Sequence, residues 1–134
     1  MNRLKVLVVG DDSVSNNLLR AILESEGLDA LCVNNGLEAL NSLNDYDANL
    51  IISDGKMPLL DGFGLAFEVK NNPRLKNIPF YLYTATYSND EHEKRAMEQG
   101  VNLYLRKSGS IRKIIHVIRD FAAAQSRHDT ATGF

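Results

Sequence analysis

The chain has 134 residues, of which 44% are hydrophobic and 24% are charged, and its formal net charge at pH 7 is −2. This length is typical of one domain with a core of its own, and the near-neutral charge speaks against direct nucleic-acid binding, which needs a basic face. No run of about 18 apolar residues is present, so we expect no membrane span. The single cysteine, Cys32, and an N-terminus without a signal-peptide pattern indicate a cytoplasmic protein with a buried, inert thiol.

Short apolar runs alternate with helical patterns along the chain. Strands are predicted at residues 5–9, 30–33, 49–53, 80–83 and 103–106. Several of these runs are apolar on both faces, as strands are in a parallel sheet that helices cover on two sides. The alternation therefore predicts an α/β fold, a doubly wound three-layer sandwich.

The helices are predicted from apolar residues at three- and four-residue steps and from their end signals. The first helix is expected to bury a stripe formed by Val14, Leu18, Ile22 and Leu23. The fourth is expected to begin with a capping box of Ser88 and Glu91, and the fifth to have Ser110 as its N-cap.

The end of the chain differs from the rest in composition. From Gln125 onward the apolar stripe of the last helix gives way to polar residues. We therefore expect one domain at residues 1–124, followed by a polar tail at 125–134 that frays or begins a linker.

Polar side chains follow four of the predicted strands at the point where each strand ends. Asp11 and Asp12 follow the first strand, Asp54 the third, Thr84 the fourth and Lys107 the fifth. The carboxyl ends of parallel strands meet at one edge of the sheet, where open α/β folds hold their ligands. Carboxylates that lie close together repel one another unless a cation sits among them, and Mg²⁺ suits such oxygen ligands together with phosphate. The set is suited to transfer of a phosphoryl group onto a carboxylate, and Asp54 is the best candidate for the acceptor.

In this order, these residues resemble the receiver domain of two-component response regulators, from about Arg3 to Ala124. The further motifs that carry the resemblance are Gly36-Leu37-Glu38-Ala39-Leu40, Met57-Pro58, Asp61-Gly62, Thr84-Ala85 and Gly100. The resemblance implies a flavodoxin-like (βα)5 fold with a parallel sheet in the order 2-1-3-4-5. It also implies a signalling domain that catalyses only its own phosphorylation and dephosphorylation.

The resemblance implies a role for each residue at the strand ends. Asp54 would accept a phosphoryl group from the phosphohistidine of a sensor histidine kinase or a phosphotransfer protein. Asp12, Asp54 and the backbone carbonyl of Lys56 would bind Mg²⁺ directly, and Asp11 would act largely through water. Lys107 would pair with the phosphoryl group, or with Asp54 before it is modified.

The resemblance also implies a conformational switch. Thr84 would move toward the phosphoryl oxygen and Tyr104 would follow it inward, although Tyr104 alone also fits a core residue. The face formed by residues 89–124 would then bind a downstream protein partner or form a homodimer. Lys56, which resembles a position on the path of the attacking water, and Thr86 are expected to modulate the reaction.

Two further positions depart from the receiver pattern. Receivers usually have a proline after the lysine, often with a cis peptide bond, and this chain has Ser108, so the direction in which Lys107 points is less constrained. Gly55 replaces a bulkier aliphatic residue after the phosphoacceptor and should loosen that loop.

Three other functions stay open on the sequence alone. A Mg²⁺-dependent phosphatase with an aspartyl nucleophile usually has a second acid two residues after the nucleophile, where this chain has Lys56. A flavodoxin-like nucleotide binder needs a Gly/Ser/Thr-rich loop after the first strand, where this chain has Gly10-Asp11-Asp12-Ser13. A receiver-like interaction module that never handles phosphate is compatible with Ser108 and Gly55. The chain could be a stand-alone regulator or a piece of a longer protein.

Overall fold

The computed structural model describes residues 3–85, 89–107 and 111–132. The strands are β1 (Lys5–Val9), β2 (Asp29–Val33), β3 (Leu50–Ser53), β4 (Phe80–Thr84) and β5 (Leu103–Arg106). The helices are α1 (Ser13–Ser25), α2 (Gly36–Ser42), α3 (Gly62–Lys70), α4 (Asp90–Glu98) and α5 (Arg112–Thr132). Each predicted strand is present, with ends that differ from the prediction by at most one residue.

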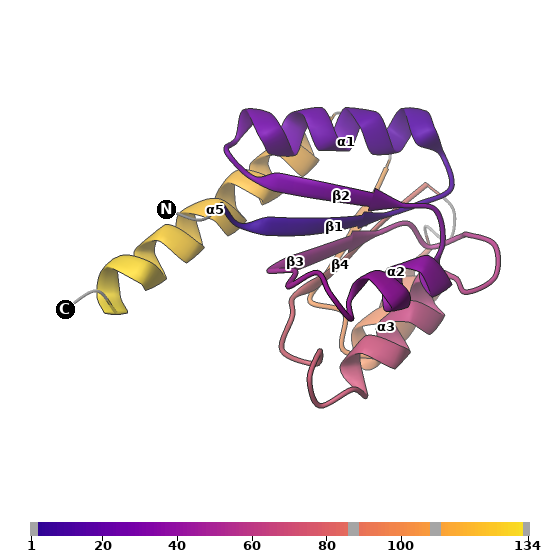
Figure 1. Ribbon diagram of the computed structural model, residues 1–134. Helices are drawn as coiled ribbons and strands as arrows, with labels where there is room; N and C mark the ends of the chain where they lie inside the picture. The colour runs from indigo at the N-terminus through magenta and orange to yellow at the C-terminus, as the bar shows by residue number, and fades with distance from the viewer. Residues whose placement is uncertain (1–2, 86–88, 108–110, 133–134) are drawn as a thin grey trace.

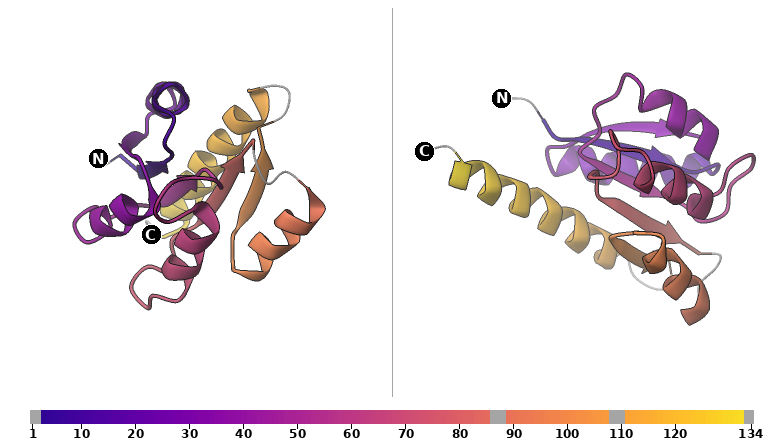
Figure 2. Two further views of the ribbon diagram at one scale, coloured as in Figure 1. Left: turned by 90° about the vertical axis from the view of Figure 1, so that its right-hand side faces the viewer. Right: turned by 90° about the horizontal axis from the view of Figure 1, so that it is seen from below.

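The five strands form one parallel sheet in the order β2-β1-β3-β4-β5, which confirms the predicted topology. Helices α1 and α5 cover one face of this sheet, and α2, α3 and α4 cover the other (Figures 1 and 2). The three layers are those of a doubly wound, flavodoxin-like fold.

The side chains of β1 alternate between the two halves of the core. Leu7 and Val9 pack with residues of α2, α3 and α4, whereas Val6 and Val8 pack with residues of α1 and α5. All four are at most 2% exposed, because helices cover both faces of the strand. This two-sided burial explains why the strand is a continuous apolar run in the sequence.

Helix α1 contacts the sheet through a different face from the predicted one. Its buried residues are Asn16, Leu19, Ile22 and Leu23. The prediction was right for Ile22 and Leu23 but wrong for Val14 and Leu18, which are 75% and 52% exposed. The apolar residues of α1 span more than one face of the helix, so packing against β2 and α5 decides which face is buried.

The beginning of α4 also differs from the prediction. The N-cap residue is Asn89, whose side-chain oxygen accepts a hydrogen bond from the backbone N–H of His92 at 2.8 Å. The predicted capping box of Ser88 and Glu91 is therefore wrong. Asn89 is as good a cap as serine, so the local sequence permits either choice. Ser88, like the predicted N-cap Ser110 of α5, lies outside the described residues.

Helix α5 continues to Thr132, beyond the residue at which the polar tail was expected to begin. That this tail frays or begins a linker stays a prediction. The sequence contains no glycine or proline between Ile111 and Gly133 that would interrupt the helix. Its C-terminal part extends beyond the edge of the sheet (Figure 1). Among the described helices, none combines the length and the hydropathy that a membrane span requires. The boundary of the domain at residue 124 stays a prediction.

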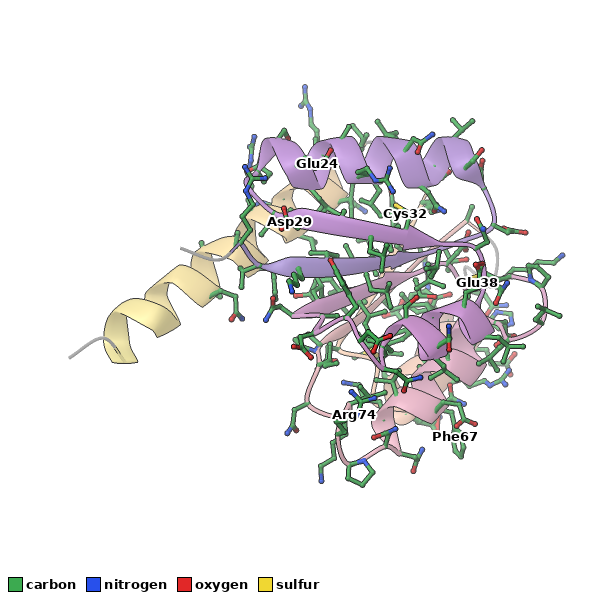
Figure 3. All side chains as sticks on the ribbon, in the orientation of Figure 1. Glu24, Asp29, Cys32, Glu38, Phe67 and Arg74 are labelled. Atoms are coloured by element: carbon green, nitrogen blue, oxygen red, sulfur yellow. The ribbon has the colours of Figure 1, made fainter. Side chains whose placement is uncertain are left out.

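Cys32 lies on β2 and points toward α1 (Figure 3). Its Sγ is 3.7 Å from the backbone oxygen of Asn16, and the residue is half-buried rather than fully buried. Burial raises the pKa of the Cys32 thiol. The thiol is therefore protonated near neutral pH, as expected of an inert cysteine.

The start of α3 packs directly on the loop that carries Asp54. The N–H of Gly62 donates a hydrogen bond to the backbone oxygen of Gly55 at 2.9 Å. A Cβ atom at Gly62 would overlap the backbone oxygen of Asp54 and come within 2.8 Å of Leu82 Cδ1. Glycine at this position therefore permits the close approach of helix and loop.

We predict that Gly62→Ala lowers the free energy of unfolding by about 1–3 kcal/mol, because the added methyl group has no room beside the Asp54 backbone. Gly64→Ala in the same helix is the matched control. Its Cβ would meet the flexible end of Leu60, at 2.6 Å from Cδ1, and alanine favours the helix by about 1 kcal/mol. Urea denaturation of both variants measures the difference. Equal unfolding free energies would contradict the proposed close approach.

Candidate functional site

The hydrogen bonding of the sheet continues past the ends of three strands. The backbone N–H of Asp54 donates a hydrogen bond to the backbone oxygen of Val9 at 2.8 Å. The backbone N–H of Lys107 donates one to the backbone oxygen of Thr84 at 2.9 Å. Gly10, which precedes Asp11, donates in the same way to Val33 at 3.0 Å. The neighbouring strands therefore fix the backbone of the residues that follow β1, β3 and β5.

This arrangement brings Asp54 and Lys107 together from two strands that β4 separates. Lys107 Nζ lies 3.5 Å from Asp54 Oδ2, and Asp54 Oδ1 accepts a hydrogen bond from the N–H of Gly55 at 2.7 Å. The two side chains are only 20% and 21% exposed. Solvent and salt screen such a pair less than a pair on the open surface. The carboxylate of Asp54, with the ammonium of Lys107 beside it, is therefore partly buried at the edge of the sheet but still reaches solvent.

The two aspartates after β1 differ in their environment. Asp12 is the N-cap of α1, where Oδ1 accepts from the N–H of Val14 at 3.0 Å and Oδ2 from the hydroxyl of Ser15 at 2.9 Å. The hydrogen bond from Ser15 lowers the pKa of Asp12, and the charge of Lys107 contributes in the same direction. Asp12 is therefore ionised at neutral pH. Asp11 is exposed beside it.

Asp12, Asp54 and Lys107 line the same cavity, which has a volume of about 70 Å³. Within residues 3–85, 89–107 and 111–132, no three side chains of His, Cys, Asp or Glu lie close enough together to form a metal site by themselves. Mg²⁺ does not need three, because it keeps several waters and takes one or two carboxylates. Each carboxylate oxygen of Asp12 can still accept a second interaction besides its hydrogen bond at the cap. The donor set therefore fits a partly hydrated Mg²⁺ ion.

The two residues expected to form the switch are both buried. Thr84 is fully buried at the end of β4, on the strand between Asp54 and Lys107. Tyr104 is 8% exposed and packs with the part of the core under α2, α3 and α4. Its hydroxyl has no hydrogen-bond partner among the described residues, and burial raises its pKa. Tyr104 is therefore directed inward in this structure.

The other residues singled out from the sequence have varied positions. Gly55, which follows Asp54, is buried, whereas Lys56 is exposed. Asp61 is the N-cap of α3, and its side chain accepts a hydrogen bond from the backbone N–H of Gly64 at 2.8 Å. Thr86 and Ser108 lie outside the described residues.

Sequence reasoning missed Asn16, which supports the loop after β1. Its Nδ2 donates a hydrogen bond to the backbone oxygen of Gly10 at 2.7 Å, and the residue is buried in α1. Asparagine in a helix usually faces solvent, so the pattern contains no signal for this role. This hydrogen bond connects α1 to Gly10, the residue that precedes Asp11.

We predict that Asn16→Ala lowers the free energy of unfolding by about 1–3 kcal/mol, because the buried oxygen of Gly10 loses its partner. Asn17→Ala is the matched control, since Asn17 is exposed in the same turn of α1 and gains the same helix propensity. Urea denaturation gives the stabilities, and amide hydrogen exchange reports whether Gly10 and Asp11 open faster. Equal effects of the two substitutions would show that Asn16 does not support the loop.

Comparison with known proteins adds an independent finding. The chain matches the family model of the response regulator receiver domain over residues 6–119. A 14.6 kDa protein of Leptolyngbya boryana is 34% identical over 122 residues, which cover 91% of this chain and 92% of that protein.

Solved structures resemble the fold over most of its length. The signal receiver domain of a signal transduction histidine kinase from Syntrophus aciditrophicus has a TM-score of 0.75 and 30% identity, with 87% of this chain and 89% of that chain covered. The receiver domain of the sensor histidine kinase PA1611 from Pseudomonas aeruginosa, solved with magnesium coordinated in its active-site cleft, has a TM-score of 0.77 and 23% identity. That comparison covers 89% of this chain and 97% of the other.

These findings agree with one another. The strand order is that of the resemblance noted in the sequence, and the family match includes Asp11, Asp12, Asp54, Thr84 and Lys107. They favour a receiver over the phosphatase and the nucleotide binder. The chain belongs to the family of response regulator receiver domains, which serve phosphorylation-dependent two-component signalling.

Proposed function

We propose that this chain is a signalling switch in which Asp54 receives a phosphoryl group from the phosphohistidine of a sensor histidine kinase or a phosphotransfer protein. The observation that carries the proposal is the half-buried pair of Asp54 and Lys107, with Nζ 3.5 Å from Oδ2. In the reaction, a carboxylate oxygen of Asp54 attacks phosphorus, a P–O bond forms and the P–N bond of the donor breaks. The imidazole leaves with the electron pair of that bond and takes up a proton.

Asp12 and Asp54 are proposed to hold Mg²⁺ together with the backbone carbonyl of Lys56, and Asp11 to contact its water shell. Bound there, the ion would supply positive charge to offset the repulsion between the carboxylate and the incoming phosphoryl oxygens. The lowered pKa of Asp12 supports this role, because the carboxylate stays charged under neutral conditions. Lys107 supplies the second positive charge from the end of β5, at the same edge of the sheet.

Phosphorylation leaves a charge of roughly −1.5 to −2 at Asp54, in place of the −1 of the carboxylate, if the acyl phosphate ionises like other phosphoresidues. Lys107 would shift from the carboxylate to the phosphoryl oxygens. The hydroxyl of Thr84 would donate a hydrogen bond that exists only in the modified state, worth about 1.5–3 kcal/mol because the acceptor is charged. A bias of this size shifts a two-state equilibrium by roughly one to two orders of magnitude.

The surface that responds is proposed to be α4, β5 and α5, within residues 89–124. Arg106 links β5 to α4 by two ion pairs. Its Nη2 lies 2.9 Å from Asp90 Oδ1 and 3.2 Å from Glu93 Oε1. Movement of Thr84 would change the packing of Tyr104 on the same strand, and α4 would follow through Arg106. A downstream protein, or a second copy of the chain, would recognise the changed surface.

This function involves no separate substrate, so the domain catalyses only its own phosphorylation and dephosphorylation. Lys56 is exposed two residues after Asp54 in the chain, and its ammonium is proposed to slow or redirect the water that hydrolyses the acyl phosphate. Thr86 is proposed as a second modulator of that step. A cytoplasmic location, where a kinase can reach Asp54, is part of the proposal.

The phosphodonor is proposed to dock on the outer surface of α1. Leu18 and Ile111 line the same cavity as Asp54, yet they are 52% and 39% exposed. Apolar side chains beside a reactive group and open to solvent favour a protein partner over a small substrate. This accounts for the exposure of Leu18, which the sheet does not bury.

We predict that Asp54→Asn abolishes phosphorylation by acetyl phosphate in the presence of Mg²⁺, because an amide oxygen is a poor nucleophile. Asp47→Asn, an exposed position away from the site, is the control and should label like the wild type. Chelation of Mg²⁺ with EDTA should suppress labelling of the wild type as well. Mass spectrometry of the intact proteins measures the added phosphate. Labelling of Asp54→Asn to the wild-type level would refute the assignment.

We further predict that Leu18→Asn slows phosphotransfer from the phosphorylated donor protein by roughly tenfold, because an apolar contact of about 1–2 kcal/mol is lost at the docking surface. The rate with acetyl phosphate, which needs no docking, should not change. Leu37→Asn on α2, at a leucine that is similarly exposed, is the control. A uniform effect on both donors would place the defect in the site and not in docking.

A further inference from the structure

Lys107 has a second contact that the proposed reaction does not use. Its Nζ lies over the ring of Tyr83, 5.0 Å from the ring centroid. We propose that Tyr83 is a positioning residue whose aromatic face holds the Lys107 ammonium beside Asp54. This inference rests on the proposed function of the site.

The lysine needs such a support because its side chain is long and flexible. Four rotatable bonds separate Nζ from the backbone, and fixing them in one geometry is entropically unfavourable. The backbone bond from Lys107 to Thr84 fixes only the start of the side chain. The residue that follows is Ser108, which lacks the fixed φ of the proline usual in receivers.

The placement of Tyr83 follows from the alternation of side chains along β4. Thr84 and Leu82 are fully buried, whereas Tyr83 projects to the side of α1 and α5. On that side it lines the same cavity as Asp54 and Lys107. The ring therefore supports the ammonium from the side of α5, while Asp54 attracts it from β3.

The chemistry of the contact suits this task. The face of an aromatic ring carries partial negative charge and attracts a cation, most strongly where water is partly excluded. Burial raises the pKa of Tyr83, so the ring remains a neutral phenol. A neutral ring can release the ammonium when the phosphoryl group adds negative charge nearby. A second carboxylate in the place of the ring would hold the ammonium more strongly and release it less readily.

The test compares three variants in the full chain. Tyr83→Phe keeps the aromatic face, and Tyr83→Leu removes it while retaining an apolar side chain. Tyr81→Leu is the matched control, because Tyr81 lies on the same strand and the same side, is also half-buried, and packs edge-on against Phe121.

Labelling with acetyl phosphate and Mg²⁺ should be roughly 3- to 10-fold slower in Tyr83→Leu, as expected for loss of a partly buried cation–π contact. Tyr83→Phe and Tyr81→Leu should label at the wild-type rate. The proposal is overturned if Tyr83→Leu labels as fast as Tyr81→Leu. It is also overturned if Tyr83→Phe is as slow as Tyr83→Leu, since the hydroxyl would then be the active group.

A second readout does not depend on phosphorylation. In the wild type and Tyr83→Phe, the ring should shift the NMR signals of the Lys107 Cε protons upfield, and Tyr83→Leu should abolish the shift. If the wild type does not label but shows this shift, the proposed function fails and the positioning of Lys107 stands. Identical Lys107 signals in the wild type and Tyr83→Leu would overturn the positioning itself.

Discussion

The pairing of β3 with β1 and of β5 with β4 is the constraint on which the site depends. Val9 lies opposite Ser53, and Thr84 lies opposite Arg106, so Asp54 and Lys107 follow at the same edge of the sheet. A slip of either strand by one residue would turn these side chains to the other face. In β3 the apolar side chains buried on both faces oppose such a slip, and in β5 Tyr104 packs on one face of the sheet and Leu105 on the other. The hydrophobic core thus sets the geometry of the charged site.

Around this edge, single residues serve both the fold and the chemistry. Asp12 begins α1 as its N-cap, and its carboxylate, kept ionised by Ser15, is also proposed to bind Mg²⁺. Asn16 links the same helix to the loop before Asp11. Gly62 lets α3 pack on the backbone of Asp54. Because these contacts are shared, the loops at the edge remain in place although they carry several like charges.

Much of the fold could be predicted from the sequence because strand residues buried on both faces form continuous apolar runs. The meeting of Asp54 with Lys107 followed from those runs and from the polar residues at their ends, whereas the strand order followed from the resemblance to receiver domains. The buried face of α1 could not be predicted in full, since Leu18 and Leu19 are adjacent and only packing selects Leu19. The length of α5 was missed because a polar composition from Gln125 onward does not by itself end a helix. The proposed role of Tyr83 depends on a residue far along the chain, and Asn16 bonds to Gly10 from a helix position where asparagine usually faces solvent, so no local pattern reveals either contact.

The most direct test of the account is a crystal structure of the protein with Mg²⁺ and beryllofluoride, which mimics a phosphoryl group on an aspartate. We expect beryllofluoride on Asp54, Mg²⁺ bound by Asp12 and Asp54, and Lys107 Nζ within hydrogen-bonding distance of a fluoride, as the proposed phosphoryl transfer requires. An unmodified Asp54, or a Lys107 side chain turned away into solvent while the adduct is present, would contradict it.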